Sequence, residues 1–224
     1  IQIHTLHQRT VDVDHRQGLA AGVRTTAIDD GFSGTLNSGG AGSTNANYAT
    51  GTHTSIYNGQ GGNDSVSFSG TLSGAGRLLG GAGADLLTLN NASSISGVAA
   101  ADVAGFETVN LQTNSTTTML GDHLDTFLAV GAANFNATGT ETVNITDTTF
   151  STTIDNDTAG PAASEEIETY NFTSTSAHNV ALLDTAASSQ TINVNLAAGA
   201  ANQVTLNNAT HETLGNNSEF VING

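Results

Sequence analysis

The 224-residue sequence has no cysteine, no tryptophan and a single proline. Without cysteine there is neither a disulfide framework nor a thiolate metal site, so stability has to come from repetition, hydrogen bonding or a metal held by other ligands. No apolar run reaches the roughly 18 residues that a membrane-spanning helix needs. We therefore expect a protein that does not span a membrane.

Positive charge is scarce as well. The chain has four Lys and Arg residues against 20 Asp and Glu residues, which gives a formal net charge of −16, and all the cations are arginine. Such a chain repels nucleic acids and anionic lipid surfaces, because binding to phosphates depends on cationic side chains. Divalent cations are the partners that this charge favours.

The motifs of common catalytic sites are also missing. The sequence contains no G-x-S-x-G elbow, no G-x-x-x-x-G-K-[ST] phosphate loop and no H-E-x-x-H zinc motif, and without lysine it cannot use lysine chemistry. Acidic and hydroxyl residues are plentiful, yet nothing spaces them as a catalytic set. We therefore expect a protein that is not an enzyme.

What the sequence does contain is repetition. The segment "FETVNL" at 106–111 returns as "TETVNI" at 140–145, as "IETYNF" at 167–172 and, more weakly, as "SQTINV" at 189–194. Apolar and polar residues alternate in these segments, as in a strand with one buried face, and recurring strands at varying spacing are typical of stacked coils. The sequence thus predicts an all-β fold of β-solenoid or β-roll type, with irregular loops and few short helices. Its predicted core consists of Val109, Leu111, Val143, Ile145, Tyr170, Phe172, Ile192 and Val194.

Two further pairs of segments are similar to each other. "LTLNNAS" from Leu87 returns as "VTLNNAT" from Val204, and "FSGTLNSGG" from Phe32 returns as "FSGTLSGAG" from Phe68. Helical patterns are few, and we expect short helical turns at 97–106 and 178–189. Residues 38–55 combine Gly, Ser, Thr and Asn without an apolar period, which predicts a loop.

The chain divides into an N-terminal arm, residues 1–30, and a repeat-built β domain, residues 31–224. Three of the four arginines lie in the arm, whereas the β domain is strongly acidic. The arm contains the strand-like pieces "IQI" and "VDVD". Two arrangements follow: the arm pairs head to tail with a neighbouring copy, or it folds back as the first coil of its own chain.

The segment "LGGAGADLLT" at 79–88 carries the clearest chemical signal. Glycine can adopt backbone conformations that are closed to other residues, and this turn has three: Gly80, Gly81 and Gly83. Several carbonyl oxygens can therefore point to one place, and Asp85 adds a charged oxygen. Hard oxygen ligands from a flexible turn suit Ca²⁺ better than Zn²⁺. The alternative is a glycine-rich turn in which Asp85 caps its own loop.

Residues 80–88 match the nonapeptide G-G-x-G-x-D-x-U-x at every fixed position, and "GQGGNDSVS" at 59–67 matches it except at Gln60. These segments resemble the hemolysin-type calcium-binding repeats of secreted RTX proteins. The resemblance implies Ca²⁺ bound between stacked turns by Gly59, Gly61, Asn63, Asp64, Gly81, Gly83 and Asp85. Asp64 and Asp85 lie 21 positions apart, about three more than two nonapeptides give, so we expect one or two sites rather than a long calcium roll.

A second acidic loop is "DNDTAGPAASEE" at 155–166. Asp155, Asp157 and Glu166 meet the D-x-[DN]-x-[DN]-G-x₅-E calcium-loop pattern, but Ala159 stands where an oxygen ligand belongs. No helices flank the segment, so it is not an EF-hand. It is either a further calcium loop or a solvated acidic loop.

The whole chain also resembles calcium-dependent bacterial surface-layer (S-layer) proteins secreted by type I systems. These are acidic, free of cysteine, rich in Thr, Ala, Gly and Asn, and combine RTX turns with "FETVN"-like strands. The resemblance implies an extracellular, cell-surface structural protein that assembles with its own copies into a calcium-stabilised lattice or filament, with a cell-surface glycan or lipopolysaccharide as a further partner. The alternatives are a non-catalytic RTX module of a secreted enzyme and a secreted adhesin.

Overall fold

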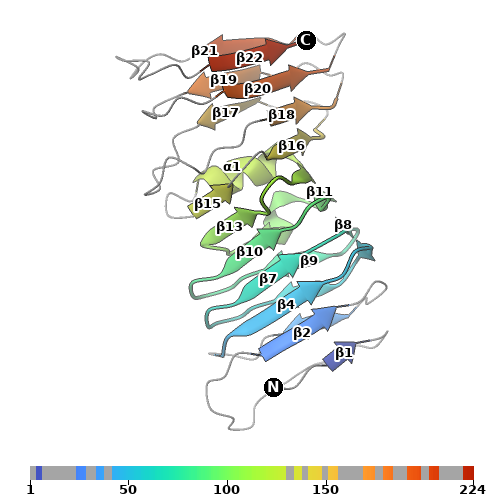
Figure 1. The fold of residues 1–224 in the computed structure, drawn as a ribbon. Helices are drawn as coiled ribbons and strands as arrows, with labels where there is room; N and C mark the ends of the chain where they lie inside the picture. Colours follow the sequence, from blue (N-terminus) through green and yellow to red (C-terminus); the bar gives the residue numbers. More distant parts are fainter. Residues whose placement is uncertain are drawn as a thin grey trace.

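In a computed structural model, the chain is described at residues 4–6, 24–28, 34–37, 42–129, 134–137, 141–147, 151–155, 169–174, 179–183, 191–197, 202–206 and 219–224. These residues form a β-solenoid, in which successive coils of the chain stack on one another from β1 at one end to β22 at the other (Figure 1). The strand pairs are parallel throughout. The prediction of an all-β solenoid is confirmed.

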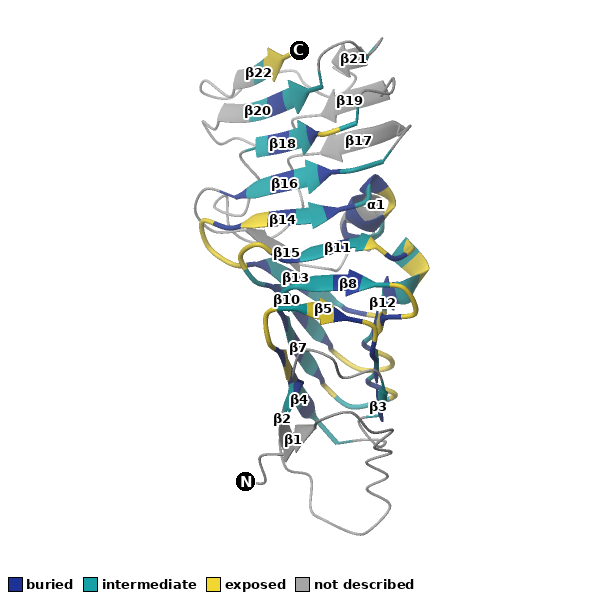
Figure 2. Ribbon diagram, turned by 90° about the vertical axis from the view of Figure 1, so that its right-hand side faces the viewer, coloured by how far each residue is buried: buried dark blue, intermediate teal, exposed yellow. Residues whose placement is uncertain are grey.

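Two long sheets form the broad faces of the solenoid (Figures 1 and 2). The seven-stranded sheet has the order β1 (His4–Leu6), β2 (Arg24–Ile28), β4 (Thr44–Tyr48), β7 (Ser65–Phe68), β10 (Leu86–Leu89), β13 (Thr108–Leu111) and β15 (Asn134–Ala137). The eight-stranded sheet has the order β5 (Thr52–His53), β8 (Thr71–Ser73), β11 (Ser94–Gly97), β14 (Thr116–Met119), β16 (Thr142–Ile145), β18 (Thr169–Phe172), β20 (Thr191–Leu196) and β22 (Glu219–Asn223).

Two shorter sheets form the third side. The four-stranded sheet consists of β3 (Thr35–Asn37), β6 (Ile56–Asn58), β9 (Arg77–Leu79) and β12 (Val103–Ala104). The three-stranded sheet consists of β17 (Ser151–Asp155), β19 (Asn179–Leu183) and β21 (Gln203–Leu206). A coil such as β7, β8 and β9 therefore contributes one strand to each of three sheets.

The described part of the chain contains two short helices between its strands. The 3₁₀ helix η1 (Ala100–Asp102) lies within the predicted segment 97–106, and the α-helix α1 spans Gly121–Ala129. α1 buries His123, Leu124 and Phe127, which are spaced to share one helix face. None of the helices described has the length and apolar character to cross a membrane.

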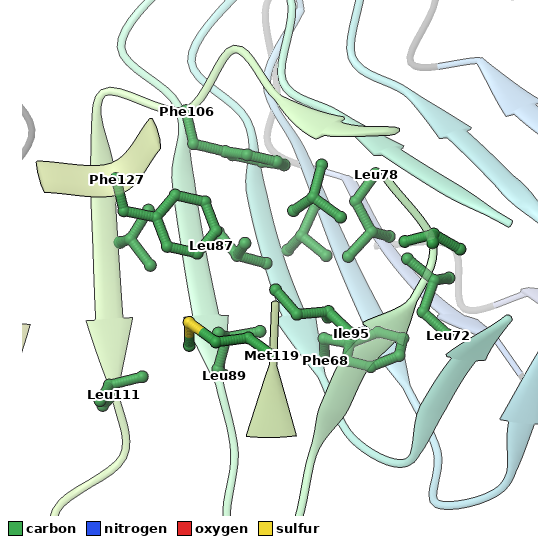
Figure 3. Close-up of a cluster of buried hydrophobic side chains, with 14 of the residues drawn as sticks. Phe68, Leu72, Leu78, Leu87, Leu89, Ile95, Phe106, Leu111, Met119 and Phe127 are labelled. Carbon is green, nitrogen blue, oxygen red and sulfur yellow. The ribbon is translucent and has the colours of Figure 1, made fainter. Parts of the chain in front are cut away.

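The core lies inside the coils and is continuous. Alternation buries every second residue: Val109 and Leu111 in β13, Val143 and Ile145 in β16, Tyr170 and Phe172 in β18, and Val194 in β20 all belong to one apolar cluster. Figure 3 shows side chains from several coils, such as Phe68, Leu87 and Ile95, meeting in this interior. Seven of the eight predicted core residues are thus confirmed, while the side chain of Ile192 lies outside the described set.

The repeated segments do not occupy equivalent places in the stack. "ETVNL" forms β13 of the seven-stranded sheet, whereas its counterparts form β16, β18 and β20 of the eight-stranded sheet. Thr142 pairs with Thr169, as the repeats align, but Thr169 pairs with Asn193, two residues beyond the aligned Thr191. A shift of the pairing by two residues leaves the same side chains on the inner face, so the alternation of buried and outward residues is preserved.

Two local predictions are wrong. Residues 38–55 contain strands β4 and β5 rather than one loop, because Thr44, Ala46 and Tyr48 alternate inward although only the last is large. Residues 179–183, predicted as part of a helical turn, form β19, which pairs with β17 and β21. Parallel neighbours on both sides supply this segment with backbone hydrogen bonds that outweigh its local helical preference.

Two strands of the N-terminal arm pair within the chain. β1 pairs with β2, and β2 pairs with β4 over five residues. The fold-back alternative is therefore the arrangement seen for 4–6 and 24–28, whereas the "IQI" and "VDVD" pieces lie outside the described residues.

Candidate metal centre

The two glycine-rich turns stack directly on each other. Gly62 N–H donates to Ala82 O at 3.0 Å, and Ala82 N–H donates to Gln60 O at 3.0 Å. An isolated parallel bridge joins Gly61 to Ala82. A spacing of 21 residues is therefore one complete coil, and residues 59–64 lie over residues 80–85.

Glycine is required because the turns touch through their backbones. A Cβ on Gly83, whose φ is +151°, would lie 1.6 Å from the carbonyl oxygen of Gly62. The departure from the nonapeptide at Gln60 puts a non-glycine residue at φ +61°, in the left-handed region. Such a residue costs on the order of 1 kcal/mol and persists because the stacked turn holds it.

The acids at the ends of these turns form a column between coils. Asp64 Oδ1 accepts a hydrogen bond from Thr44 N at 2.7 Å, and Asp85 Oδ1 accepts one from Asp64 N at 2.7 Å. Glu107 Oε2 accepts one from Asp85 N, again at 2.7 Å. We call Asp64, Asp85 and Glu107 the carboxylate column. Each of its members satisfies a backbone N–H of the preceding coil.

Carboxylates cap backbone groups elsewhere in the solenoid too. Glu141, which is fully buried, accepts a hydrogen bond from Asn114 N at 2.9 Å through Oε1. Asp147 accepts one from Gly121 N at the start of α1, where the positive end of the helix dipole also favours an acid. Capping is thus a general structural use of acids in this chain.

Asp85 is a buried member of this group of capping acids, as Glu141 is. The side chain is 1% exposed, and its Oδ2 has no hydrogen-bond partner in the structure. Burial raises the pKa of Asp85; the hydrogen bond from Asp64 N opposes this shift, and the negative charge of Glu107 adds to it. The charged group acting on Asp85 is therefore another acid rather than a cation.

A buried phenol lies in the same interior. Burial raises the pKa of Tyr57 above its ordinary range, and the charges of Asp64 and Asp85 raise it further. The Tyr57 hydroxyl has no hydrogen-bond partner in the structure. The negative charges of Asp64 and Asp85 therefore act on a buried hydroxyl group inside the coils.

The predicted ligands fit Ca²⁺ through their carboxylates more than through their turn carbonyls. The buried Oδ2 of Asp85 is a hard oxygen without a partner, and a divalent cation is the counterion that neighbouring buried acids favour. The carbonyls of Gln60 and Ala82, in contrast, accept hydrogen bonds from the facing turn, and Asn63 Oδ1 accepts one from Ala84 N. Within the described residues, no group of three or more acidic or histidine side chains is placed to hold a metal. Backbone oxygens or water would have to complete the coordination.

The structure brings together seven of the ten predicted ligands and places one other, Asp155, in a different part of the solenoid. Gly59, Gly61, Asn63 and Asp64 lie in one turn, and Gly81, Gly83 and Asp85 lie in the turn stacked on it. Asp155 ends β17 in the three-stranded sheet, and Asp157 and Glu166 lie outside the described residues. Sequence reasoning missed Glu107, although its spacing of 22 residues from Asp85 nearly repeats the spacing of 21 between the two aspartates.

Comparison of this chain with protein-family models, with curated proteins and with solved structures finds no match.

The raised pKa of Asp85 gives a pH dependence with a definite sign. In calcium-free buffer the folded protein should bind a proton at Asp85 at a pH where the unfolded chain, with a carboxyl pKa near 3.8, does not. The stability of the wild type relative to Asp85→Asn should therefore rise as the pH falls from 7 toward 4. Urea unfolding of both proteins across this range measures the difference. A difference that stays constant, or one that moves the other way, would contradict the assignment.

Proposed function

We propose that this chain is an extracellular structural protein that assembles with its own copies into a calcium-stabilised surface layer or fibre. The observation that supports this most is the parallel stacking, in which neighbouring described coils are joined by at least one of the two long sheets from β1 to β22. A solenoid held by inter-coil hydrogen bonds and one continuous core is a stiff rod suited to a mechanical role. The resemblance to S-layer proteins adds the extracellular location and the self-assembly.

Bound calcium would reduce the negative charge of this solenoid. Asp64 and Asp85, with Glu107 next in the column, are the residues that would hold it, and the bound cation would neutralise acids buried between coils. A chain with a net charge of −16 repels itself when no counterion is bound. Because Ca²⁺ binds the folded coils and not the separated chain, binding would stabilise the fold and the assembly together.

Calcium should raise the melting temperature, and Asp85→Asn should remove most of that rise. At a concentration 100 times the dissociation constant, one site adds about 2.7 kcal/mol, which corresponds to roughly 5–10 °C for a chain of this size. Calorimetry with excess Ca²⁺ and with EGTA measures the shift. Asn keeps an oxygen that can accept the hydrogen bond from Asp64 N, so the cap itself is retained.

Two matched variants complete this experiment. Asp102→Asn removes an acid that pairs at the surface with Arg77, at 2.9 Å, and should leave the calcium response intact. Asp155→Asn should reduce the response less than Asp85→Asn does. Equal melting of the wild type with and without Ca²⁺ would refute the site, and a larger effect of Asp155→Asn would move it to the other loop.

Electron microscopy of the purified chain tests the assembly. We expect ordered sheets or fibres in millimolar Ca²⁺ and their dispersal in EGTA. Particles that stay monomeric in both conditions at high protein concentration would refute the structural role. Glycan binding by such monomers would favour the adhesin alternative instead.

A further inference from the structure

The eight-stranded sheet presents one uninterrupted row of uncharged polar side chains. The pairing register aligns one residue from each strand, and each is a hydroxyl or an amide residue: Thr52, Thr71, Ser94, Thr118, Asn144, Asn171, Asn195 and Asn223. A second row, two residues earlier, contains Thr116, Thr142, Thr169, Asn193 and, at the end of the stack, the apolar Val221. Figure 2 shows the eight strands one above another on the side that faces the viewer. We call the two rows together the ladder face.

The amides of the first row are held in a hydrogen-bonded column. Asn171 Nδ2 donates to Asn144 Oδ1 at 2.9 Å, Asn195 Nδ2 donates to Asn171 Oδ1 at 2.7 Å, and Asn223 Nδ2 donates to Asn195 Oδ1 at 2.8 Å. A side-chain amide has two N–H donors and two acceptor lone pairs. Each hydrogen bond in the column uses one N–H of one asparagine and one lone pair of the next. The column fixes the amide orientations, and each amide keeps a further N–H donor and a further acceptor lone pair.

The ladder face also avoids the electrostatic repulsion that opposes contact between copies. The chain carries a net charge of −16, yet none of the aligned residues in the two rows is ionisable. The outer row of the seven-stranded sheet is uncharged as well, with Asn47, Ser67, Thr88 and Asn110 in register. In that row only two amides, Asn110 and Asn136, are consecutive, whereas four consecutive amides follow one another on the ladder face.

We propose that the ladder face is the surface on which two copies of this chain pack against each other, face to face around a two-fold axis. This inference rests on the proposed self-assembly and specifies its contact. Amide columns are self-complementary, and because their orientations are already fixed, association costs little side-chain entropy. Like-charge repulsion is lowest where neither copy presents a carboxylate.

The size of the ladder face sets how strong one such contact is. Eight strands at about 4.8 Å spacing give a length of roughly 34 Å, and two rows of side chains give a width of roughly 14 Å. The area is therefore on the order of 500 Å² per copy, at the lower end of what a specific pair of proteins buries. A single pair is weak by itself, and repetition of the contact in a layer or fibre stabilises it.

Paired glutamates on each sheet test this surface. Thr116→Glu with Thr169→Glu places two charges on the ladder face, two coils apart. Asn47→Glu with Thr88→Glu places the same two charges on the seven-stranded sheet, also two coils apart. Sedimentation velocity in Ca²⁺ should show association weakened at least tenfold for the first variant and nearly unchanged for the second. Circular dichroism and melting establish that both variants are folded.

The outcomes separate this inference from the proposed function. If the wild type does not associate, the self-assembly is refuted and the ladder-face contact with it. If the wild type associates and both variants associate equally well, or both lose association, the ladder face alone is refuted. Binding of the wild type to a soluble neutral polysaccharide that is lost in the Thr116 and Thr169 variant, without self-association, would assign the face to a glycan instead.

Cross-linking gives a second measurement that does not depend on added charge. The chain has no cysteine, so a single introduced thiol is unique. Thr118→Cys, near the middle of the first row, should form a covalent dimer with a short bismaleimide in Ca²⁺, and Thr88→Cys on the other sheet should not. Equal dimer yields from the two proteins would overturn the proposal.

Discussion

Leu89→Asp should unfold the coils around it. Leu89 is fully buried in β10 and pairs with Phe68 and Leu111 of the neighbouring coils. The substitution removes about 2–3 kcal/mol of apolar burial and places an unpaired carboxylate in the core, which costs several kcal/mol more. The sum is comparable to the 5–15 kcal/mol that holds a typical domain together. Far-UV circular dichroism and urea unfolding measure the loss.

Thr88→Asp is the matched control because it introduces the same charge one residue earlier. Thr88 points outward from the same strand, between Ser67 and Asn110. We expect a change within about 1 kcal/mol, as for most surface substitutions. Similar unfolding of the two variants would mean that the strand does not bury alternate residues as described.

Gly80→Ala should destabilise the protein by about 3 kcal/mol or more, with or without calcium. A Cβ at this position would lie 1.9 Å from the carbonyl oxygen of Gly105 in the next coil, far inside van der Waals contact. The turn would have to move away, which would break the hydrogen bond of 3.0 Å from Gly80 N to Ala104 O. Thermal and urea unfolding in EGTA measure this effect without a contribution from bound metal.

Gly42→Ala provides the contrast. A Cβ there meets no atom within 4 Å, and the φ of Gly42 lies outside the left-handed region. The substitution should be neutral or stabilise by up to about 1 kcal/mol, because alanine restricts the unfolded chain. Equal tolerance of both substitutions would show that the turns are not in backbone contact.

Part of the candidate site was predictable, because turns that recur after one coil length stack on each other. Two matching turns 21 residues apart predict stacked turns, and the structure places Asp85 over Asp64 as expected. Sequence could not reveal that Gln60 O and Ala82 O are engaged by the facing turn, because hydrogen bonds between coils depend on how closely the coils approach. It also did not identify Glu107 as the next member of the column, because Glu107 lies in the strand repeat "FETVNL" and outside both matches to the nonapeptide.

Local alternation by itself determined which residues are buried. The pattern in "TVNI" at Thr142–Ile145 places Val143 and Ile145 inside, because adjacent side chains of a strand point to opposite faces whatever the partner strand is. The same reasoning failed at 44–48, where two of the three inward residues, Thr44 and Ala46, are small and give only a weak apolar pattern.

The partner of each strand was decided only by the tertiary structure. Nearly identical segments, "TVNL" at Thr108–Leu111 and "TVNI" at Thr142–Ile145, lie in different sheets, and β18 pairs with β20 two residues out of the repeat alignment. Any parallel neighbour satisfies the backbone of such a strand, and a shift of two keeps its buried face. Sequence therefore determined the solenoid class, the buried residues and the stacking of the two glycine turns. Loop lengths and packing between coils decided which sheet each strand joins, and with it the amide column and the uncharged face.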